Sequence, residues 1–220
     1  MGEKSLHNII KNRYAKPGDK IEVPIKTYII DIVRDDLLIE IQTRNFSAIK
    51  DKLINLLVDH KIRLIYPISQ LKWIVRINKD GKTVKSRRRS PKKGRLEDLF
   101  AELVYIPRLL SHPNFELEIL FIHSEDIFLD DGKGSWRRKR WSIHDRRLLD
   151  ILSSQIITTP NNLLDILPDT IDKEFTTKQL AEEKGIPIGL TRKMIYSLRE
   201  MGLIKKTGKR GRSPVYSRIF

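Results

Sequence analysis

The segment YIIDIVRDDLLIEIQ, which runs from Tyr28 to Gln42, constrains the fold most strongly. It contains two apolar runs of strand length, separated by a short polar turn, and this arrangement predicts a β-hairpin. The hairpin carries Asp31 on its first strand and Glu40 on its second. Because side chains alternate along a strand, Glu40 and Gln42 point to the same face. The segment therefore predicts acidic groups gathered on neighbouring strands of a sheet.

Patterns on either side of this hairpin predict an α/β fold with helices flanking a sheet. The predicted helices span residues 3–14, 46–59, 96–110 and 142–156. Besides the hairpin, the predicted strands span residues 21–25, 62–68, 72–77 and 115–123. Two further segments are predicted as a basic loop (82–95) and as a linker with one short helix (158–170).

The charge of the chain indicates a polyanionic partner. The formal net charge is +15 and the isoelectric point is about 10, which favours nucleic acid first and an anionic membrane surface second. The absence of cysteine excludes disulfides and thiolate zinc sites, and it favours a cytoplasmic location. No apolar run reaches the roughly 20 residues that span a bilayer, so we expect no membrane insertion.

Two basic segments are predicted to meet nucleic acid. Residues 82–95 hold eight basic residues and no acidic residue, which favours phosphate contacts over a merely solvated loop. The expected contact residues are Arg87, Arg88, Arg89, Lys92 and Lys93. In WRRKRW (136–141), either tryptophan could stack on a base, or Trp141 could pack on the helix predicted at 142–156. The nearby GKGS does not fit a phosphate-binding loop, so we expect no nucleotide cofactor.

From Phe175 onward the sequence changes character. A helix capped by Thr176 or Thr177, a turn at Gly185, a second helix over 189–201 and a hairpin with a basic tip follow one another. Over about 45 residues this order resembles the winged-helix family of DNA-binding domains.

That resemblance implies a recognition helix in the major groove and a wing on phosphates. It places Thr191, Arg192, Lys193 and Tyr196 on the exposed face of the recognition helix. The implied wing contacts are Lys205, Lys206, Lys209, Arg210 and Arg212. Winged helices also serve as protein–protein modules, but the basic tip favours nucleic acid.

Residues 1–78 resemble the PD-(D/E)XK nuclease superfamily. The shared features are a first helix with an acid (Glu3), a strand with Asp31, a strand with Glu40-Ile41-Gln42, then a helix and a further strand. The resemblance implies a restriction-endonuclease-like mixed sheet with flanking helices, followed here by the small winged helix-turn-helix domain. It also implies a divalent cation, Mg²⁺ or Mn²⁺, held by Asp31, Glu40 and the carbonyl of Ile41, with Glu3 nearby.

One residue departs from the family pattern. Gln42 occupies the usual lysine position, and an amide can donate hydrogen bonds but carries no charge. Arg44 could supply the charge if the strand continues that far. The alternative is structural: buried acids need partners, and Arg13 and Arg44 are available for salt bridges.

These observations predict three regions: a nuclease-like domain (1–125), a basic helical linker (126–172) and a winged helix (173–220). The predicted function is metal-dependent cleavage of DNA, with Asp31, Glu40, Gln42 and Glu3 as catalytic residues. Two alternatives stay open: a non-catalytic DNA-binding protein or regulator with a degenerate core, and an RNA-binding or RNA-processing component. DNA is favoured over RNA, and the sequence leaves open whether the chain forms a homodimer.

Overall fold

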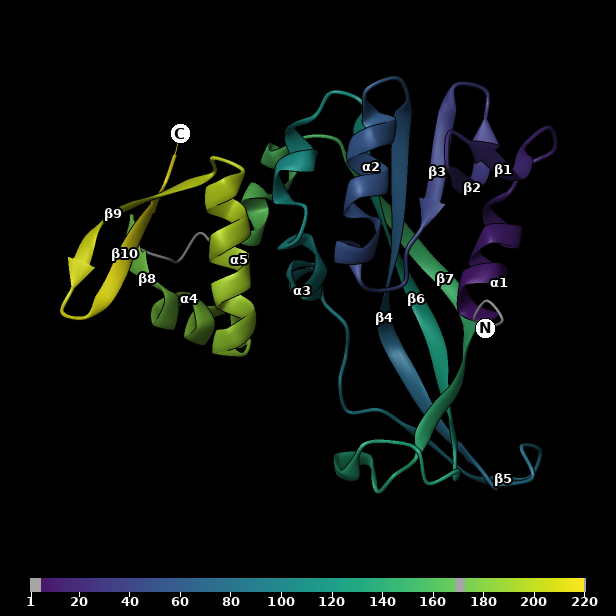
Figure 1. The fold of residues 1–220 in the computed structure, drawn as a ribbon. Helices are drawn as coiled ribbons and strands as arrows, with labels where there is room; N and C mark the ends of the chain where they lie inside the picture. Colours follow the sequence, from purple (N-terminus) through teal and green to yellow (C-terminus); the bar gives the residue numbers. More distant parts are fainter. Residues whose placement is uncertain (1–4, 169–172, 220) are drawn as a thin grey trace. The chain divides into compact units, whose positions relative to one another are not determined.

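The computed structural model describes residues 5–168 and 173–219, so the expected acid Glu3 lies outside the described residues. The fold is α/β, with a large mixed sheet and flanking helices (Figure 1). The chain divides into two compact units. Unit 1 comprises residues 1–43, 65–95 and 119–155, and unit 2 comprises residues 44–64, 96–118 and 156–220.

The large sheet has seven strands in the order β1-β2-β3-β4-β6-β7, and β5 pairs with β4 beside this path. The hairpin expected from the sequence is present as β2 and β3 in antiparallel register. The strands are β1 (Lys20–Ile25), β2 (Tyr28–Arg34), β3 (Leu37–Ile41), β4 (Lys61–Ile77), β5 (Val84–Arg89), β6 (Phe115–Leu129) and β7 (Ser142–Ile157).

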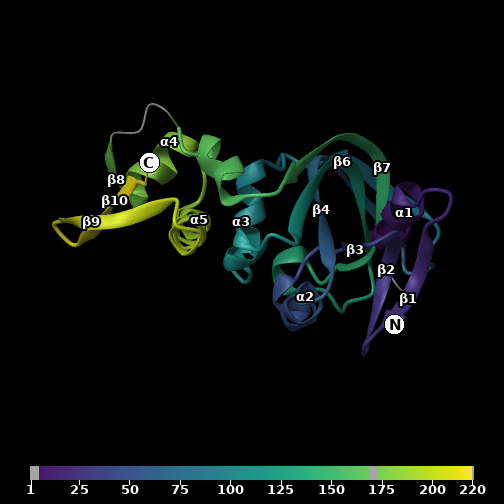
Figure 2. The ribbon, with the colours of Figure 1, turned by 90° about the horizontal axis from the view of Figure 1, so that it is seen from above.

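Helix α1 (Ser5–Tyr14) fills the core of unit 1. Leu6 and Ile10, on its apolar face, pack into one hydrophobic cluster with residues from five strands. Those residues are Ile32, Ile39, Ile41, Ile65, Leu120, Ile122 and Leu148. Seen from above, the strands of this unit curve around α1 (Figure 2). The curvature brings the N-terminal helix beside the strands that carry the predicted acids.

Unit 2 contains a short helix and a C-terminal module of helices and strands. Helix α2 (Lys50–Leu57) buries Leu53, Leu56 and Leu57, and the 3₁₀ turn η1 (Phe46–Ile49) leads into it. The C-terminal module consists of β8 (Glu174–Thr176), α4 (Thr177–Lys184), α5 (Ile188–Glu200), β9 (Ile204–Arg210) and β10 (Ser213–Arg218). Its three strands pair in the order β8-β10-β9.

The helix predicted at 142–156 is wrong, because this segment is the strand β7. Its closely spaced leucines fit a helix as well as a strand, and periodicity alone cannot separate the two conformations. Pairing with β6 decides the outcome, and Leu148 enters the core of unit 1. The predicted helical linker at 126–172 therefore contains a long strand, with only the short 3₁₀ helix η5 (Pro160–Ile166) behind it among the described residues.

Three smaller predictions also need correction. The two strands expected at 62–68 and 72–77 form the single strand β4, because nothing between them ends the pairing. The basic loop at 82–95 contains the strand β5, which pairs with β4. The helix expected at 96–110 is broken into η2 (Leu96–Leu99), α3 (Phe100–Leu103) and η3 (Pro107–Ser111). Pro107 contributes to the break because it lacks an N–H group and begins a new turn.

Candidate functional site

The β2–β3 hairpin brings the two predicted acids together. Ile32 pairs with Ile39, and Val33 pairs with Leu38. Continuing this register by one residue puts Asp31 opposite Glu40, and directly opposed residues of an antiparallel pair share a face. The local sequence produces this arrangement because the turn at residues 35 and 36 connects strands whose apolar residues must face the core.

Asp31 contacts the neighbouring strand directly. Its Oδ2 accepts a hydrogen bond of 2.8 Å from the backbone N–H of Ile41, the central residue of the Glu-Ile-Gln motif. The same oxygen lies 3.1 Å from Nε2 of His7 on α1. The Asp31 side chain is 15% exposed and the His7 side chain 18% exposed, so both groups remain accessible at the edge of the core. Three elements therefore converge on one carboxylate.

Glu40 lies on β3, and Gln42 directly follows the end of this strand. Glu40 is buried, with 6% of its surface exposed, whereas Gln42 is half-buried. The backbone N–H of Gln42 donates to the carbonyl of Ile65, so pairing with β4 extends past the end of β3. Residues 43 and 44 then bend away, and Arg44 is exposed. The strand therefore does not continue to Arg44, which was the condition for Arg44 to supply the missing charge.

The hairpin offers oxygen donors of the type that hard divalent cations accept, but not, among the described residues, a complete set of side-chain ligands. Two carboxylates on paired strands, with a backbone carbonyl between Glu40 and Gln42, are oxygen ligands of the kind that Mg²⁺ and Mn²⁺ accept. Within residues 5–168 and 173–219, no group of three or more His, Cys, Asp or Glu side chains is arranged to hold a metal. The contacts to His7 and Ile41 hold the Asp31 carboxylate in one orientation.

The arginines of β5 form a basic edge in unit 1. All six residues of β5 are exposed, and Arg87, Arg88 and Arg89 lie opposite β4 residues in antiparallel register. Arg87 is partly committed, because its guanidinium bonds to Glu125 at 2.7 Å and stacks over Trp73. Lys92 and Lys93, which follow the strand, are exposed.

Helix α5 presents a narrower surface than the sequence indicated. Arg192 is exposed and Tyr196 is 46% exposed. Thr191 is fully buried and its hydroxyl donates to the carbonyl of Pro187, so its predicted exposure is wrong. Lys193 donates to the carbonyl of Ala101 at 3.1 Å, which draws this lysine toward α3. Lys193 is half-buried because α5 also packs against α3.

The hairpin of β9 and β10 carries a group of exposed cations in unit 2. The cations of β9 and its tip are all exposed: Lys205, Lys206, Lys209, Arg210 and Arg212. The adjoining helix α4 is firmly capped by a reciprocal pair of bonds between Thr176 and Gln179. Gly185 ends α4 with φ of +59°, a conformation that glycine adopts without strain.

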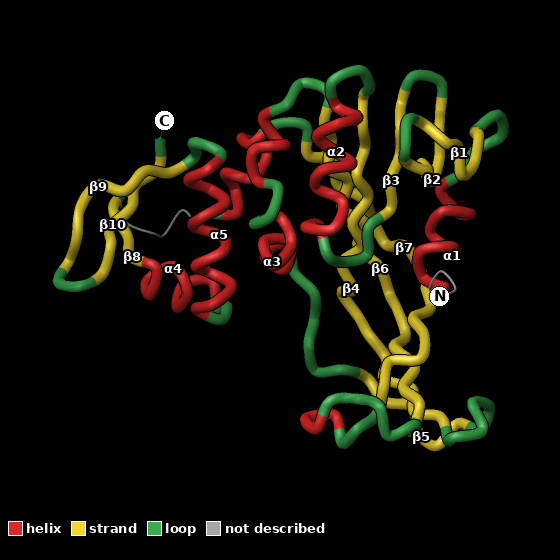
Figure 3. The backbone as a smooth tube through the Cα atoms, viewed as in Figure 1, coloured by secondary structure: helices red, strands yellow, loops and turns green. Residues whose placement is uncertain are grey.

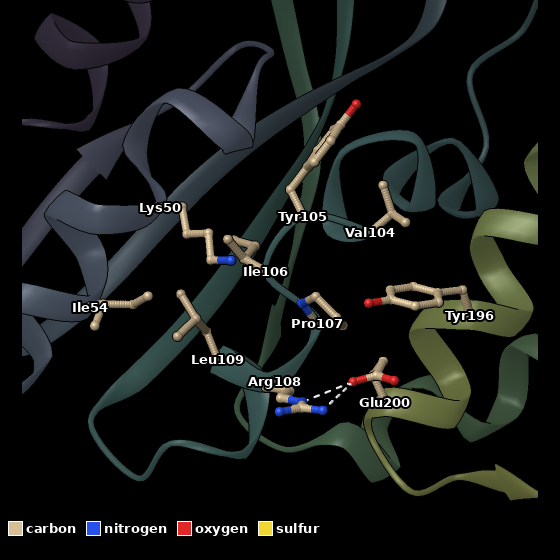
Figure 4. Close-up of a pocket in the computed structure, with 10 residues that line it drawn as sticks. All are labelled: Lys50, Ile54, Val104, Tyr105, Ile106, Pro107, Arg108, Leu109, Tyr196 and Glu200. Carbon is tan, nitrogen blue, oxygen red and sulfur yellow. Dashed lines mark hydrogen bonds and ion pairs between the residues drawn. The ribbon is translucent and has the colours of Figure 1, made fainter.

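A pocket of about 370 Å³ lies beside α5 in unit 2 (Figure 4). Tyr196 points toward Pro107 of η3, and Arg108 bonds to Glu200 at 2.7 Å across the pocket (Figure 4). Tyr105 and Ile54 add apolar surface to its wall. The ion pair closes one side of the pocket and ties α5 to η3.

Sequence reasoning missed two contributors to these surfaces. No sequence motif marks His7, and its contact with Asp31 depends on the packing of α1 against the sheet. Trp141 is buried against Arg76 and Lys85, at 5.1 and 5.6 Å from its ring centre, rather than against a following helix. The sequence does contain the basic residues Arg76 and Lys85. Their contact with Trp141 could be predicted only if the pairing of their strands were already known.

Comparisons with other proteins identify relatives but no activity. A family profile described as "Domain of unknown function (DUF8091)" matches residues 4–158. An "Uncharacterized protein" of Treponema pallidum (strain Nichols) is 33% identical over 215 residues, which cover 97% of this chain and 84% of that protein. No solved structure matches the chain. The similarity to the Treponema protein extends past the family match into the C-terminal module.

Proposed function

We propose that this chain, which belongs to the DUF8091 family, is a metal-dependent nuclease that hydrolyses phosphodiester bonds in DNA. The observation that carries the proposal is the contact of Asp31 with the backbone of Ile41, because it joins the two strands of the Asp…Glu-x-Gln pattern. The order of α1, the hairpin, α2 and β4 also agrees with a restriction-endonuclease-like core. We infer a cytoplasmic location from the cysteine-free composition.

The residues of the hairpin have distinct roles in this proposal. Asp31, Glu40 and the carbonyl of Ile41 would hold Mg²⁺ or Mn²⁺, which when bound polarises the phosphoryl group and acidifies water. His7 keeps the Asp31 carboxylate oriented through the 3.1 Å contact. Gln42 would position the attacking water by hydrogen bonding, a weaker contribution than the charge of a lysine.

The C-terminal module would position the nuclease on DNA as a winged helix. Its element order of strand, helix, helix and two-stranded hairpin supports that assignment. The exposed cations of β9 and its tip would meet phosphates, and Arg192 and Tyr196 are available on α5 for groove contacts.

One observation favours a second candidate function. Gln42 is neutral and Arg44 bends away from the strand, so no cation on β3 replaces the missing lysine. A chain with this core could bind DNA through its basic surfaces without cutting it. This alternative predicts that bound DNA stays intact whether or not Mg²⁺ or Mn²⁺ is present.

The decisive experiment is cleavage of labelled duplex, branched and single-stranded DNA with Mg²⁺ or Mn²⁺. The wild-type protein should cut at least one substrate, and Glu40→Gln should lower the rate by about a hundredfold or more, because it removes a metal-ligand charge. Asp31→Asn should behave alike. Both replacements conserve shape, so loss of activity without loss of fold is the expected result.

Asp35→Asn is the matched control, since Asp35 is an exposed carboxylate in the turn of the same hairpin. Its left-handed backbone (φ of +51°) is also one that asparagine tolerates. Cleavage at the wild-type rate by Glu40→Gln would contradict the proposal that Glu40 belongs to the catalytic metal site. Tight binding without cleavage in either metal would establish the non-catalytic alternative.

A further inference from the structure

Residues 130–141 form the loop between β6 and β7, which we call the tip loop. Internal hydrogen bonds hold its conformation. Asp131 accepts hydrogen bonds from the N–H of Lys133 and the hydroxyl of Ser142, and these bonds hold the pKa of its carboxyl below the ordinary value. The N–H of Gly134 donates to the carbonyl of Arg140 at 2.8 Å. These contacts close the loop upon itself at both ends.

Backbone geometry in the tip loop is unusual. Lys139 and Arg140 are consecutive non-glycine residues with φ of +51° and +65°, a conformation that costs each residue free energy. Gly134 lies so close to Trp141 that an added Cβ would fall 1.9 Å from the carbonyl oxygen of Trp141. A loop that keeps such a shape presents its side chains in a fixed arrangement.

The two tryptophans of this loop differ sharply in exposure. Trp141 is 8% exposed, and its ring contacts Arg76 of β4 and Lys85 of β5. Trp136 is 79% exposed, and its main described companion is the guanidinium of Arg137, 5.5 Å from the ring centre. Trp141 thus anchors the tip loop to the sheet, whereas the side chain of Trp136 is exposed to solvent.

The surroundings of Trp136 are strongly basic. Lys133, Arg137, Lys139 and Arg140 are exposed in the loop itself. The tip loop lies beside β5 at one end of the long strands, and the contacts of Trp141 with Arg76 and Lys85 fix that proximity (Figure 3). The exposed arginines of β5 therefore belong to the same basic end of unit 1.

We infer that Trp136 stacks on an unpaired nucleobase, so that the tip loop directs the chain to DNA in which a base is out of the helix. Aromatic rings stack on the face of any base, and neighbouring cations hold the backbone that carries it. A fully paired duplex offers no free base face at its side. This inference rests on the nucleic-acid binding of the proposed function and names the substrate class: duplex DNA with a bulged base.

Charge and shape favour DNA over a lipid surface as the partner. An exposed indole with cations around it also occurs at membrane interfaces, where several apolar side chains normally enter together. In the described part of the tip loop, Trp136 is the only exposed large apolar side chain. The exposed cations of the loop and of β5 outnumber it and match a phosphate backbone.

The test compares binding of two labelled duplexes, one fully paired and one with a single bulged thymidine, measured by fluorescence anisotropy with EDTA present. Wild-type protein should prefer the bulged duplex. Trp136→Ala should weaken binding to the bulged duplex about tenfold and change binding to the paired duplex less than about twofold. Trp136→Phe keeps a ring and should retain most of the preference.

Val84→Ala is the matched control, because Val84 is 59% exposed on neighbouring β5 and carries no ring. It should bind both duplexes like the wild type. Acrylamide quenching gives a direct readout: bulged DNA should protect the exposed tryptophan in the wild type and not in Trp136→Phe.

Equal losses on both duplexes, or no loss, in Trp136→Ala would overturn the inference. So would unchanged DNA binding in Trp136→Ala together with lost binding to vesicles of equimolar phosphatidylcholine and phosphatidylserine. Failure of the wild type to bind any DNA would overturn the proposed function as well. A bulge preference without cleavage under Mg²⁺ or Mn²⁺ would support the inference while overturning the nuclease proposal.

Discussion

At the scale of single residues, Asp19 and Arg34 illustrate how a side chain outside the candidate site supports it. The guanidinium of Arg34 donates to both carboxylate oxygens of Asp19, at 2.9 and 2.8 Å, and to the carbonyl of Tyr14 at 3.0 Å. The hydrogen bond from Arg34 is the main reason why the pKa of Asp19 falls from 3.8 to about 2. These bonds tie the end of α1 to β2, the strand that carries Asp31.

Asp19→Asn should make the stability of the protein depend less on pH. Because the pKa of Asp19 is depressed by folding, its contribution is present above its unfolded pKa and is lost as pH falls toward 2. We expect the variant to be less stable by about 1–3 kcal/mol at neutral pH, with the difference shrinking below about pH 4. Urea unfolding at a series of pH values checks this, with Asp35→Asn alongside. A difference that stays constant down to about pH 2 would contradict it.

At the scale of elements, local pattern predicted the parts of the fold whose partners are near in sequence. The β2–β3 hairpin and the capped helix α4 were predicted because a turn or cap residue marks their ends. The strands β5 and β7 were not, because their conformation is decided by pairing with β4 and β6. The arginine run of β5 has no apolar alternation, so its sequence contains no strand signal.

In the candidate site, too, local contacts could be predicted from the sequence and contacts that depend on tertiary packing could not. The pairing of the Asp31 and Glu40 strands followed from the alternation of the hairpin, whereas the approach of His7 required the core packing of α1. The exposed face of α5 was implied by the winged-helix resemblance, but its packing against α3, which draws in Lys193, could not be known from residues 188–200 alone.

Gly134→Ala tests how rigidly the tip loop is built. The added methyl group has no space beside Trp141, so the turn must open, at a cost of about 1–3 kcal/mol. Thermal unfolding should report the loss, and the fluorescence of Trp141 should shift toward that of an exposed indole. Gly208→Ala is the control, because no atom lies within 4 Å of the added Cβ there. Equal unfolding temperatures for the two variants would show that the loop yields freely.

At the scale of the whole molecule, basic groups are spread over both units. The net charge of +15 includes the arginines of β5 in unit 1 and the cations of β9 in unit 2. Among residues 5–168 and 173–219, no helix has the length and apolar character to cross a bilayer. The proposed binding to DNA should be dominated by the release of counterions from phosphates, because exposed cations lie in both units.

Changing Lys205 and Lys209 together to glutamine should reduce the salt dependence of DNA binding. Each lost phosphate contact lowers the slope of log K against log salt by about 0.9, so the double variant should lose between about 1 and 2 units of slope. Anisotropy titrations between low and moderate salt measure this. Lys20→Gln, which removes an exposed lysine from β1, should leave the slope unchanged. An unchanged slope in the double variant would show that Lys205 and Lys209 of β9 do not contact DNA phosphates.

The division of the chain into units has a consequence for its genetics. Each unit is assembled from three separate stretches of sequence, and the two sets alternate along the chain. No single deletion, truncation or exon-like exchange can remove one unit and leave the other whole. The two units must therefore be inherited together. In agreement, the alignment with the Treponema relative covers 97% of this chain and so includes both units.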